Sequence, residues 1–140
     1  LSLPRARDAM FPGKFTAGED FDAGFGRYEM GCIFCKIVNG EVPSSKVYED
    51  DLVLAFDDIQ PQAPVHVVVV PKKHIASLNE LHDKDIWFAM LGAAQQAAKI
   101  KGIDQSGYRI VVNCGKDGTQ IIWHLHLHVM GGRLLDSKMG

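Results

Sequence analysis

Three histidines alternate with aliphatic residues late in the chain, in the run His124-Leu125-His126-Leu127-His128. Because the side chains of a strand alternate between its two faces, the imidazoles share one face and the aliphatic residues share the other. A single histidine in a sheet is usually an ordinary hydrogen-bonded residue. Three in strict alternation, out of six in the chain, point instead to metal binding or catalysis.

The chemistry open to such a row of imidazoles includes phosphoryl transfer. An imidazole is largely neutral near pH 7, so one of its nitrogens can attack phosphorus and form a covalent intermediate. Neighbouring imidazoles can donate hydrogen bonds to phosphate oxygens and stabilise the charge that develops there. The chain has no Walker phosphate-binding loop, so phosphate recognition would fall to residues such as these.

A pair of cysteines lies in the first third of the chain, in the run Cys32-Ile33-Phe34-Cys35. Such a pair can be a redox pair, half of a zinc site or two buried cysteines. The redox alternative lacks a thioredoxin-like βαβ context, and zinc would need two histidines, because no second C-x-x-C exists. Cys114 has no evident partner, and three cysteines do not resemble a disulfide framework, so we expect a reducing compartment.

Two helices and five strands are expected to position these residues. A short helix is predicted over residues 32–38, and a long helix runs from Asp83 to about Lys101, where Gly102 stops it. Strands are predicted over residues 47–49, 52–56, 66–70, 108–113 and 123–129. The valine run of residues 66–70 predicts burial on both faces. The order of elements predicts an α+β fold, an antiparallel sheet with helices packed on one side.

Bulk composition excludes several classes of protein. The 140 residues fit one domain. The net charge of -2 gives no positive electrostatic potential that would attract nucleic acid. No apolar run approaches ~18 residues, so no membrane span is expected.

Residues 1–30 hold six Gly or Pro and no periodicity, which predicts a flexible extension before a domain over residues 31–140. We expect an intracellular, cytoplasmic protein, with organelle targeting by residues 1–30 as the alternative.

The run of residues 120–133, which ends in Gly-Gly-Arg, resembles the signature of the histidine-triad (HIT) family. That ending is similar to the Hint branch of this family, the purine nucleoside phosphoramidases. Residues 54–66 and 70–75 resemble further blocks of the same branch at matching spacing, so the likeness covers about residues 31–134. It implies a HIT-like fold, with an antiparallel sheet of about five strands, one long helix and one short helix.

The resemblance also implies catalytic roles. His126 would be the nucleophile that becomes nucleotidylated, His128 would contact the phosphate or leaving group, and His66 would complete the cluster. Asp58 would take the ribose hydroxyls, although as a lone loop acid it is also an ordinary cap. The residues implied to hold the phosphate and the ribose side are Gln120 and Asn113. The residues implied to form an apolar slot for the base are Ile33, Phe34, Ile37, Val42, Phe56 and Ile59, several of which would be core residues in most folds.

The resemblance implies a structural zinc ion, because many family members with this cysteine pair bind zinc through residues that match Cys32, Cys35, His74 and His124. Such a site would tie the short helix to the histidine strand and leave the other histidines for chemistry without a metal in the chemical step. Other members lack the pair and bind no metal. The family also implies a homodimer formed by joining two sheets into one.

Two departures from the Hint pattern bear on activity. Ile121 stands where the branch usually has a serine near the phosphate, and residues 134–140 lack the usual aromatic tail. The leading hypothesis is hydrolysis of the P–N bond of an adenosine 5′-monophosphoramidate or a related purine nucleotide. The alternatives are a dinucleoside polyphosphate or nucleotide-adduct hydrolase, and a nucleotide-binding scaffold protein with little catalysis.

Overall fold

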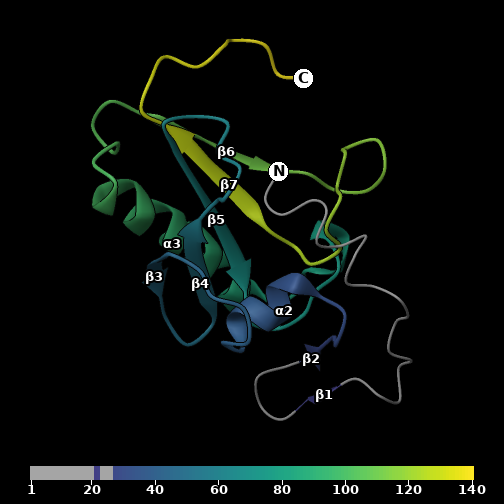
Figure 1. Ribbon diagram of the computed structural model, residues 1–140. Coiled ribbons are helices and arrows are strands. Elements are labelled where there is room, and N and C mark those ends of the chain that lie inside the picture. The colour runs from purple at the N-terminus through teal and green to yellow at the C-terminus, as the bar shows by residue number, and fades with distance from the viewer. Residues whose placement is uncertain (1–20, 23–26) are drawn as a thin grey trace.

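Five antiparallel strands form the main sheet of the computed structural model, which describes residues 21–22 and 27–140 (Figure 1). They are β3 (Lys46–Glu49), β4 (Val53–Asp57), β5 (Val65–Pro71), β6 (Tyr108–Val112) and β7 (Leu127–Gly131). Their order in the sheet is β3-β4-β5-β7-β6, so β7 pairs with β5 on one side and with the edge strand β6 on the other. Two short strands, β1 (Phe21–Asp22) and β2 (Arg27–Tyr28), pair separately. The predicted α+β fold is confirmed.

The helices begin and end at residues that the sequence marks for this purpose. In α3 (Lys84–Ile100), the Asp83 side chain accepts hydrogen bonds from two backbone amides of the first turn. Gly102 follows this helix with φ +73°, a conformation that glycine adopts without steric cost. The short helix α2 (Ile33–Val38) is capped by Cys32, whose sulfur accepts from the amide of Cys35. A 3₁₀ turn, η2 (Leu78–Glu80), precedes α3.

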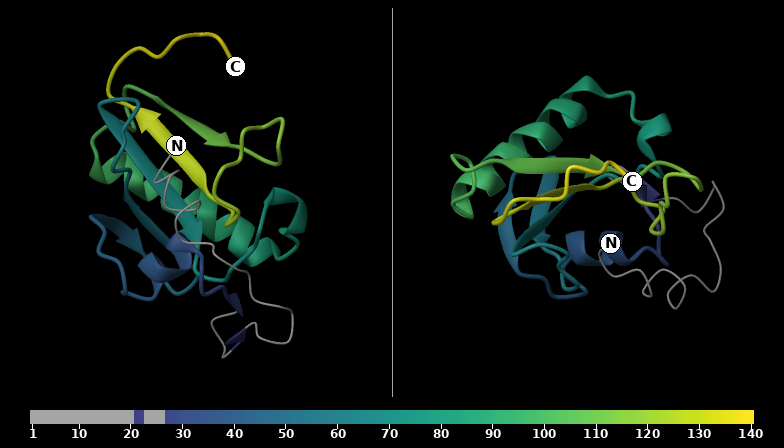
Figure 2. Two further views of the ribbon diagram at one scale, coloured as in Figure 1. Left: turned by 45° about the vertical axis from the view of Figure 1, so that its right-hand side comes forward. Right: turned by 90° about the horizontal axis from the view of Figure 1, so that it is seen from above.

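The two helices cover opposite faces of the sheet (Figure 2, right). Val67 and Val69 pack with α3, whereas Val68 and Val70 pack with α2, and all four are fully buried. The prediction that the helices pack on one side is therefore wrong. The prediction that the valine run is buried on both faces is confirmed, and such a strand needs a covering layer on each face.

The last strand is shorter than predicted and begins later. The β5–β7 ladder ends at the pair Val69–Leu127, so residues 123–126 lie outside it. There the backbone amide of Leu125 donates to the carbonyl oxygen of Ile75, in the segment that follows β5. The alternation of faces persists: Leu125 lies in the core under α3, while Phe34 of α2 contacts the neighbouring imidazoles.

The segment just before α2 belongs to the folded part of the protein. Tyr28 packs against the core beside α2, and Glu29 is buried. The predicted extension over residues 1–30 is thus docked on the domain at these two residues. Residues 1–20 and 23–26, on which the rest of this prediction and the targeting alternative depend, lie outside the described residues. Within the described part of the chain, no helix is both long and apolar enough to span a membrane.

Candidate active site and metal centre

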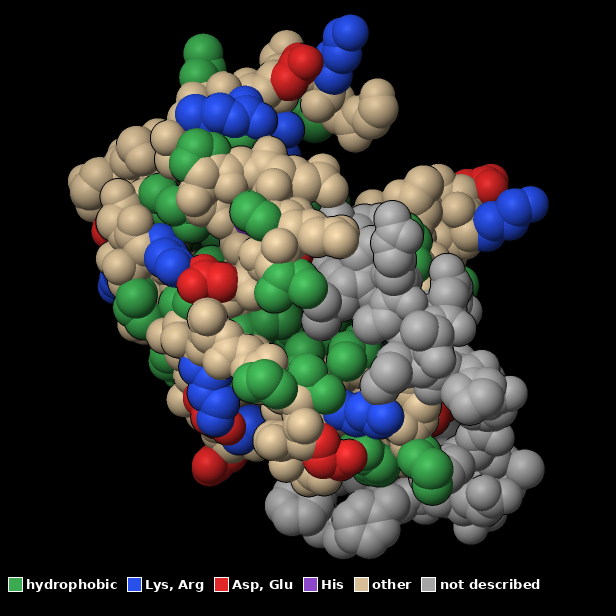
Figure 3. Space-filling model, viewed as in Figure 1, with side chains coloured by type: hydrophobic (Ala, Val, Ile, Leu, Met, Phe, Trp, Pro, Cys, Tyr) green, Lys and Arg blue, Asp and Glu red, His purple; other side chains and the backbone are tan. Residues whose placement is uncertain are grey.

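Five of the six histidines lie buried on the α2 face of the sheet. The space-filling view accordingly shows almost no histidine at the surface on that side of the molecule (Figure 3). The five fall into two groups. The Cys–His cluster consists of Cys32, Cys35, His74 and His124, and the Asp–His cluster consists of Asp58, His66, His126 and His128.

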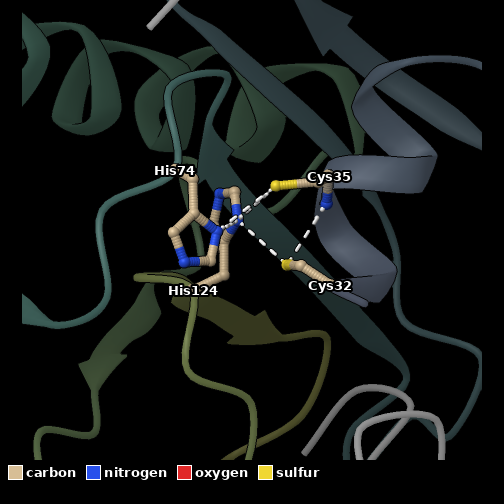
Figure 4. A group of neighbouring side chains, drawn as sticks. All are labelled: Cys32, Cys35, His74 and His124. Carbon is tan, nitrogen blue, oxygen red and sulfur yellow. Dashed lines mark hydrogen bonds between the residues drawn. The ribbon is translucent and has the colours of Figure 1, made fainter. Parts of the chain in front are cut away.

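Three separate segments bring the Cys–His cluster together (Figure 4). Cys32 and Cys35 come from the start of α2, His74 follows β5, and His124 precedes β7. Each cysteine sulfur lies 3.3 Å from the Nδ1 atom of one histidine, Cys32 from His124 and Cys35 from His74. The two Nδ1 atoms are 3.2 Å apart, and Cys35 Sγ is 3.6 Å from His124 Nδ1. The sequence-predicted ligand set therefore converges on one point.

These spacings fit a tetrahedral zinc ion. Bonds of ~2.3 Å to sulfur and ~2.0–2.1 Å to nitrogen would place a sulfur and a nitrogen donor about 3.5 Å apart, and two nitrogen donors about 3.3 Å apart. The observed separations of 3.3–3.6 Å and 3.2 Å match both values. Two sulfurs and two imidazoles are also a donor set that zinc favours in structural sites.

The ring nitrogens that face away from the cluster have partners that favour metal binding. His124 Nε2 lies 2.8 Å from the carbonyl oxygen of Pro71. Because a carbonyl oxygen only accepts, Nε2 carries the proton and Nδ1 keeps its lone pair for a metal. His74 Nε2 lies 3.6 Å from the buried Glu29 carboxylate. Sequence reasoning missed Glu29, because it lies before the region of family resemblance.

The two thiols of the cluster ionise at different pH values. Burial by itself raises the pKa of the Cys32 thiol, but the hydrogen bond with Cys35 and the charge of His124 outweigh burial and lower it. The hydrogen bond to Cys32 and burial raise the pKa of Cys35. Cys32 therefore ionises first, and the thiolate is the form that binds a metal.

His126 presents its Nε2 atom with a free lone pair. Its Nδ1 lies 2.8 Å from the backbone carbonyl oxygen of His124, so Nδ1 carries the proton of the neutral ring. The ring of Phe34 packs edge-on against it, with the centroids 5.1 Å apart. Burial lowers the pKa of His126 to about 4, so the imidazole is neutral at pH 7. A neutral, oriented imidazole of this kind is suited to nucleophilic attack.

A chain of hydrogen bonds fixes the proton of His128. The backbone amide of Gln62 donates to His66 Nδ1 at 3.0 Å, so the proton of the neutral His66 ring is on Nε2. His66 Nε2 lies 2.9 Å from His128 Nδ1, which must accept. His128 therefore carries its proton on Nε2, a buried atom with no hydrogen-bond partner in the part of the chain that the structure describes.

This unpaired donor lies beside His126. The rings of His126 and His128 have centroids 5.1 Å apart. Burial, together with the charges of His126 and His66, lowers the pKa of His128 to about 3. Burial also lowers the pKa of His66, against the opposing effect of Asp58. The Asp–His cluster thus combines neutral imidazoles with an unused donor, an arrangement suited to receive the oxygen of an anion.

Asp58 lies inside the Asp–His cluster, and its side chain is completely buried. One carboxylate oxygen accepts from the backbone amide of Gln60, and the other lies 3.2 Å from His66 Nε2. A ribose hydroxyl would have to reach a carboxylate that is already enclosed. The structure therefore pairs this residue with a histidine of the site, and the ribose role remains a prediction.

The six residues predicted to form the base slot occupy two different environments. Ile33, Phe34, Ile37 and Phe56 are buried in the core beside α2. Val42 is half-buried against that core, and Ile59 lies outside it with 66% of its surface exposed. Val42 and Ile59 are therefore the two members of this set with exposed surface, and Phe34 is the buried member whose ring contacts His124 and His126.

Asn113 and Gln120 brace the loop that leads to the histidines. Gln120 Nε2 donates to two carbonyl oxygens, those of Ala76 and Ile122, and its Oε1 accepts from an amide of the loop. Asn113 Nδ2 donates to the oxygen of Gly118. Both donor hydrogens of Gln120 are thus used, so it cannot also donate to a phosphate unless one of these bonds breaks.

The same loop contains a backbone feature that the sequence does not reveal. Thr119 has φ +60°, the left-handed conformation that β-branched residues rarely adopt. A side chain at the preceding Gly118 would meet the carbonyl oxygen of Cys114 at 2.5 Å, so the chain turns tightly there. Ile121 packs against the core beside α2 and adds an apolar wall where the Hint pattern has a serine.

The fold and the two clusters together define a histidine-triad protein that also contains a cluster of two cysteines and two histidines. A HIT domain model matches residues 39–135. The purine nucleoside phosphoramidase of Escherichia coli K12 is 42% identical over 110 residues, which cover 76% of this chain and 92% of that protein. A histidine triad protein from Clostridium difficile has 53% identity and a TM-score of 0.75, covering 79% of this chain and 97% of that one.

A HIT family hydrolase from Legionella pneumophila gives a similar result. It is 44% identical with a TM-score of 0.74, over 78% of this chain and 99% of its own. The chain belongs to the HIT family.

Proposed function

We propose that this HIT-family hydrolase cleaves the P–N bond of purine nucleoside phosphoramidates through a covalent nucleotidyl intermediate on His126. The observation that carries the proposal is the hydrogen bond between His126 Nδ1 and the backbone oxygen of His124, which leaves Nε2 with a free lone pair. The 42% identity with a purine nucleoside phosphoramidase supports the choice of substrate.

In the first step His126 Nε2 attacks phosphorus, the P–N bond breaks, and the amine leaves with the proton that His128 donates from Nε2. The support is the unpaired Nε2–H of His128, which is a donor available to a phosphate oxygen or to the departing amine. In the second step water attacks phosphorus and gives a proton back to His128 Nε2, the bond to His126 breaks, and the nucleoside monophosphate is released. His126 is neutral again and ready for another cycle.

The metal that we propose is structural zinc at the Cys–His cluster. The support is the agreement between its donor spacings and tetrahedral geometry, and the carbonyl partner of His124. Bound there, zinc would hold the start of α2 against His124. This ligand lies only two residues before His126. The reaction itself uses none of the four ligands. A thiolate site of this kind is also consistent with the cytoplasmic location that we propose.

We also propose a homodimer that joins two sheets through β6. This edge strand presents unpaired backbone groups, which are a template for another strand. Ile110 on β6 is 38% exposed, and the exposed Trp87 and Leu91 of α3 line a hollow together with Val112. An Ile110→Asp variant should be monomeric by analytical ultracentrifugation at a concentration at which the parent protein is a dimer.

The test of the proposed substrate is a side-by-side assay of the purified protein on adenosine 5′-monophosphoramidate and on a diadenosine polyphosphate. We expect a higher kcat/KM for the phosphoramidate. Faster turnover of the polyphosphate would overturn the substrate assignment. Binding of adenosine monophosphate without turnover of either compound would favour a nucleotide-binding scaffold.

A further inference from the structure

We propose that Asp58 is a positioning residue, which acts through His66 to keep the proton of His128 on the nitrogen that faces the substrate. This inference rests on the proposed function, because it gives Asp58 a task within the same reaction. It differs from the ribose-binding role that the family resemblance implies.

The first support is the burial of the Asp58 carboxylate and its contacts. The side chains of Asp58 and His66 are 0% and 1% exposed. Oδ1 is held by the backbone amide of Gln60 at 2.8 Å, which fixes the orientation of the group. Oδ2 is buried and receives no conventional hydrogen bond from the described residues, but it lies 3.2 Å from His66 Nε2. A buried carboxylate is costly unless a polar partner faces it, and here that partner is His66.

The second support is the direction of the hydrogen bonds around His66. Since the Gln62 amide occupies the lone pair of Nδ1, the proton of His66 belongs on Nε2, between Asp58 Oδ2 and His128 Nδ1. The negative carboxylate stabilises that proton position. His128 must then accept at Nδ1 and keep its own proton on Nε2, the donor left over for the substrate.

The same geometry argues against a metal among these residues. Asp58, His66 and His128 offer three donor atoms within 4.8 Å of one another, as a metal site would. However, His66 cannot offer Nε2 to a metal while the Gln62 amide holds Nδ1, because the ring would have to lose both protons. A proton between the three groups accounts for the short distances.

A substrate without ribose hydroxyls separates the two roles of Asp58. We would compare the parent protein with Asp58→Asn on adenosine 5′-monophosphoramidate and on its 2′,3′-dideoxy analogue. An asparagine amide can donate to His66 Nε2 and would favour the wrong proton position. We expect kcat to fall by about 10- to 100-fold on both substrates, the range typical of residues that orient a ligand or catalytic group. A deficit that disappears on the dideoxy substrate, or that affects KM alone, would overturn the proposal.

The matched control is Asp57→Asn, the same change one residue earlier. The Asp57 carboxylate is partly exposed and pairs with Lys101 at 2.8 Å, so its loss should leave kcat unchanged. His66→Asn provides a double-mutant cycle, because its side chain can still accept from Gln62 but has no atom at Nε2. If Asp58 acts through His66, then Asp58→Asn should have no further effect on kcat in the His66→Asn protein. A full additional loss would contradict the proposal.

Nitrogen-15 NMR of the histidine rings tests the proposal without an assay. The parent protein should show His66 and His128 protonated at Nε2, and Asp58→Asn should move the His66 proton or let it exchange between both nitrogens. If Asp58→Asn does not fold, a parent protein with His66 protonated at Nδ1 overturns the proposal on its own. A parent that turns over neither phosphoramidate refutes the proposed function, and the NMR result still decides the role of Asp58.

Discussion

His124 and His126 are two residues apart, lie on the same face of the sheet and are both buried, but they present opposite nitrogens to their surroundings. His124 donates from Nε2 to the Pro71 carbonyl and turns Nδ1 toward two cysteines. His126 donates from Nδ1 to the His124 carbonyl and leaves Nε2 available. Each ring contacts one backbone carbonyl oxygen, and that contact decides which of its nitrogens keeps a lone pair.

The clusters to which the two rings belong also differ in whether their hydrogen-bonding and ligating atoms have partners within the protein. The Cys–His cluster is closed, because four donor atoms face one another at spacings that suit one ion. The Asp–His cluster is equally buried but has an unused hydrogen-bond donor, because its last ring, His128, ends in an Nε2–H without a partner among the described residues. A residue that serves structure has its contacts satisfied within the protein, whereas a catalytic group keeps one contact for the substrate.

Replacement of His126, the proposed nucleophile, should have the largest effect on activity. His126→Asn keeps a donor for the His124 carbonyl but has no Nε2 atom, so covalent attack is lost. We expect kcat/KM for adenosine 5′-monophosphoramidate to fall by at least about 1,000-fold, as when other covalent nucleophiles are removed. His82→Asn, at an exposed histidine outside both clusters, is the control and should be fully active. Activity of His126→Asn within a few-fold of the parent would refute the assignment.

Removal of the unpaired donor should have the next largest effect. His128→Asn places an amide near the position of Nδ1, which still accepts from His66, but nothing at Nε2. Loss of one preorganised donor predicts a fall in kcat of about 100- to 1,000-fold, with a smaller change in KM. Steady-state kinetics with the same phosphoramidate checks this. A change in KM alone would assign His128 to binding instead of catalysis.

The closed cluster should respond in metal content and stability. Cys35→Ala should abolish zinc binding, measured by metal analysis of protein purified without a histidine tag, and should lower Tm, because the metal stabilises only the folded state. Cys114→Ala is the matched control, since this half-buried cysteine lies outside the cluster and should leave one zinc per chain. Parent protein without zinc and with all four ligands intact would remove the metal centre from our account.

The smallest predicted effect is the contribution of His128 to acid sensitivity. Its pKa is lowered to about 3 by burial, whereas in the unfolded chain it has the ordinary value of about 6.5. Between these two values the unfolded state binds a proton at His128 and the folded state does not. The free energy of unfolding therefore falls as the pH drops from about 6.5 toward 3. The slope from this one group is at most about 1.4 kcal/mol per pH unit.

Urea unfolding of the parent and of His128→Asn at pH 7 and pH 5 isolates this contribution. Protonation of the Cys–His cluster is common to both proteins and cancels in the difference. The variant should lose less stability than the parent between the two pH values. Equal losses would show that His128 is not held neutral by the fold.

The sequence predicted the features that depend on side-chain type and spacing. The caps at Asp83 and Gly102 predicted the ends of α3, and the alternation of histidine and leucine predicted the opposite faces on which their side chains lie. The convergence of Cys32 and Cys35 with two histidines also followed from the family motif. These signals are carried by the residues themselves.

The features that the sequence did not predict depend on backbone groups and on tertiary packing. Alternation predicts a face but not the length of a ladder, so it extends the predicted strand over residues 123–126, where Leu125 instead donates to the segment after β5. The carbonyl oxygens of Pro71 and His124 choose the free ring nitrogens, and any residue type supplies such an oxygen. Likewise, the burial of Asp58 and the exposure of Ile59 are set by the folding of the loop after β4.

The most direct test of the central claim is to identify the nitrogen that carries the nucleotide in the covalent intermediate. The intermediate would be trapped during turnover of adenosine 5′-monophosphoramidate under alkaline denaturing conditions, located by peptide mapping, and its point of attachment determined by phosphorus NMR. Our account predicts attachment to Nε2 of His126. Attachment to Nδ1 of His126, or to His124 or His128, would contradict it.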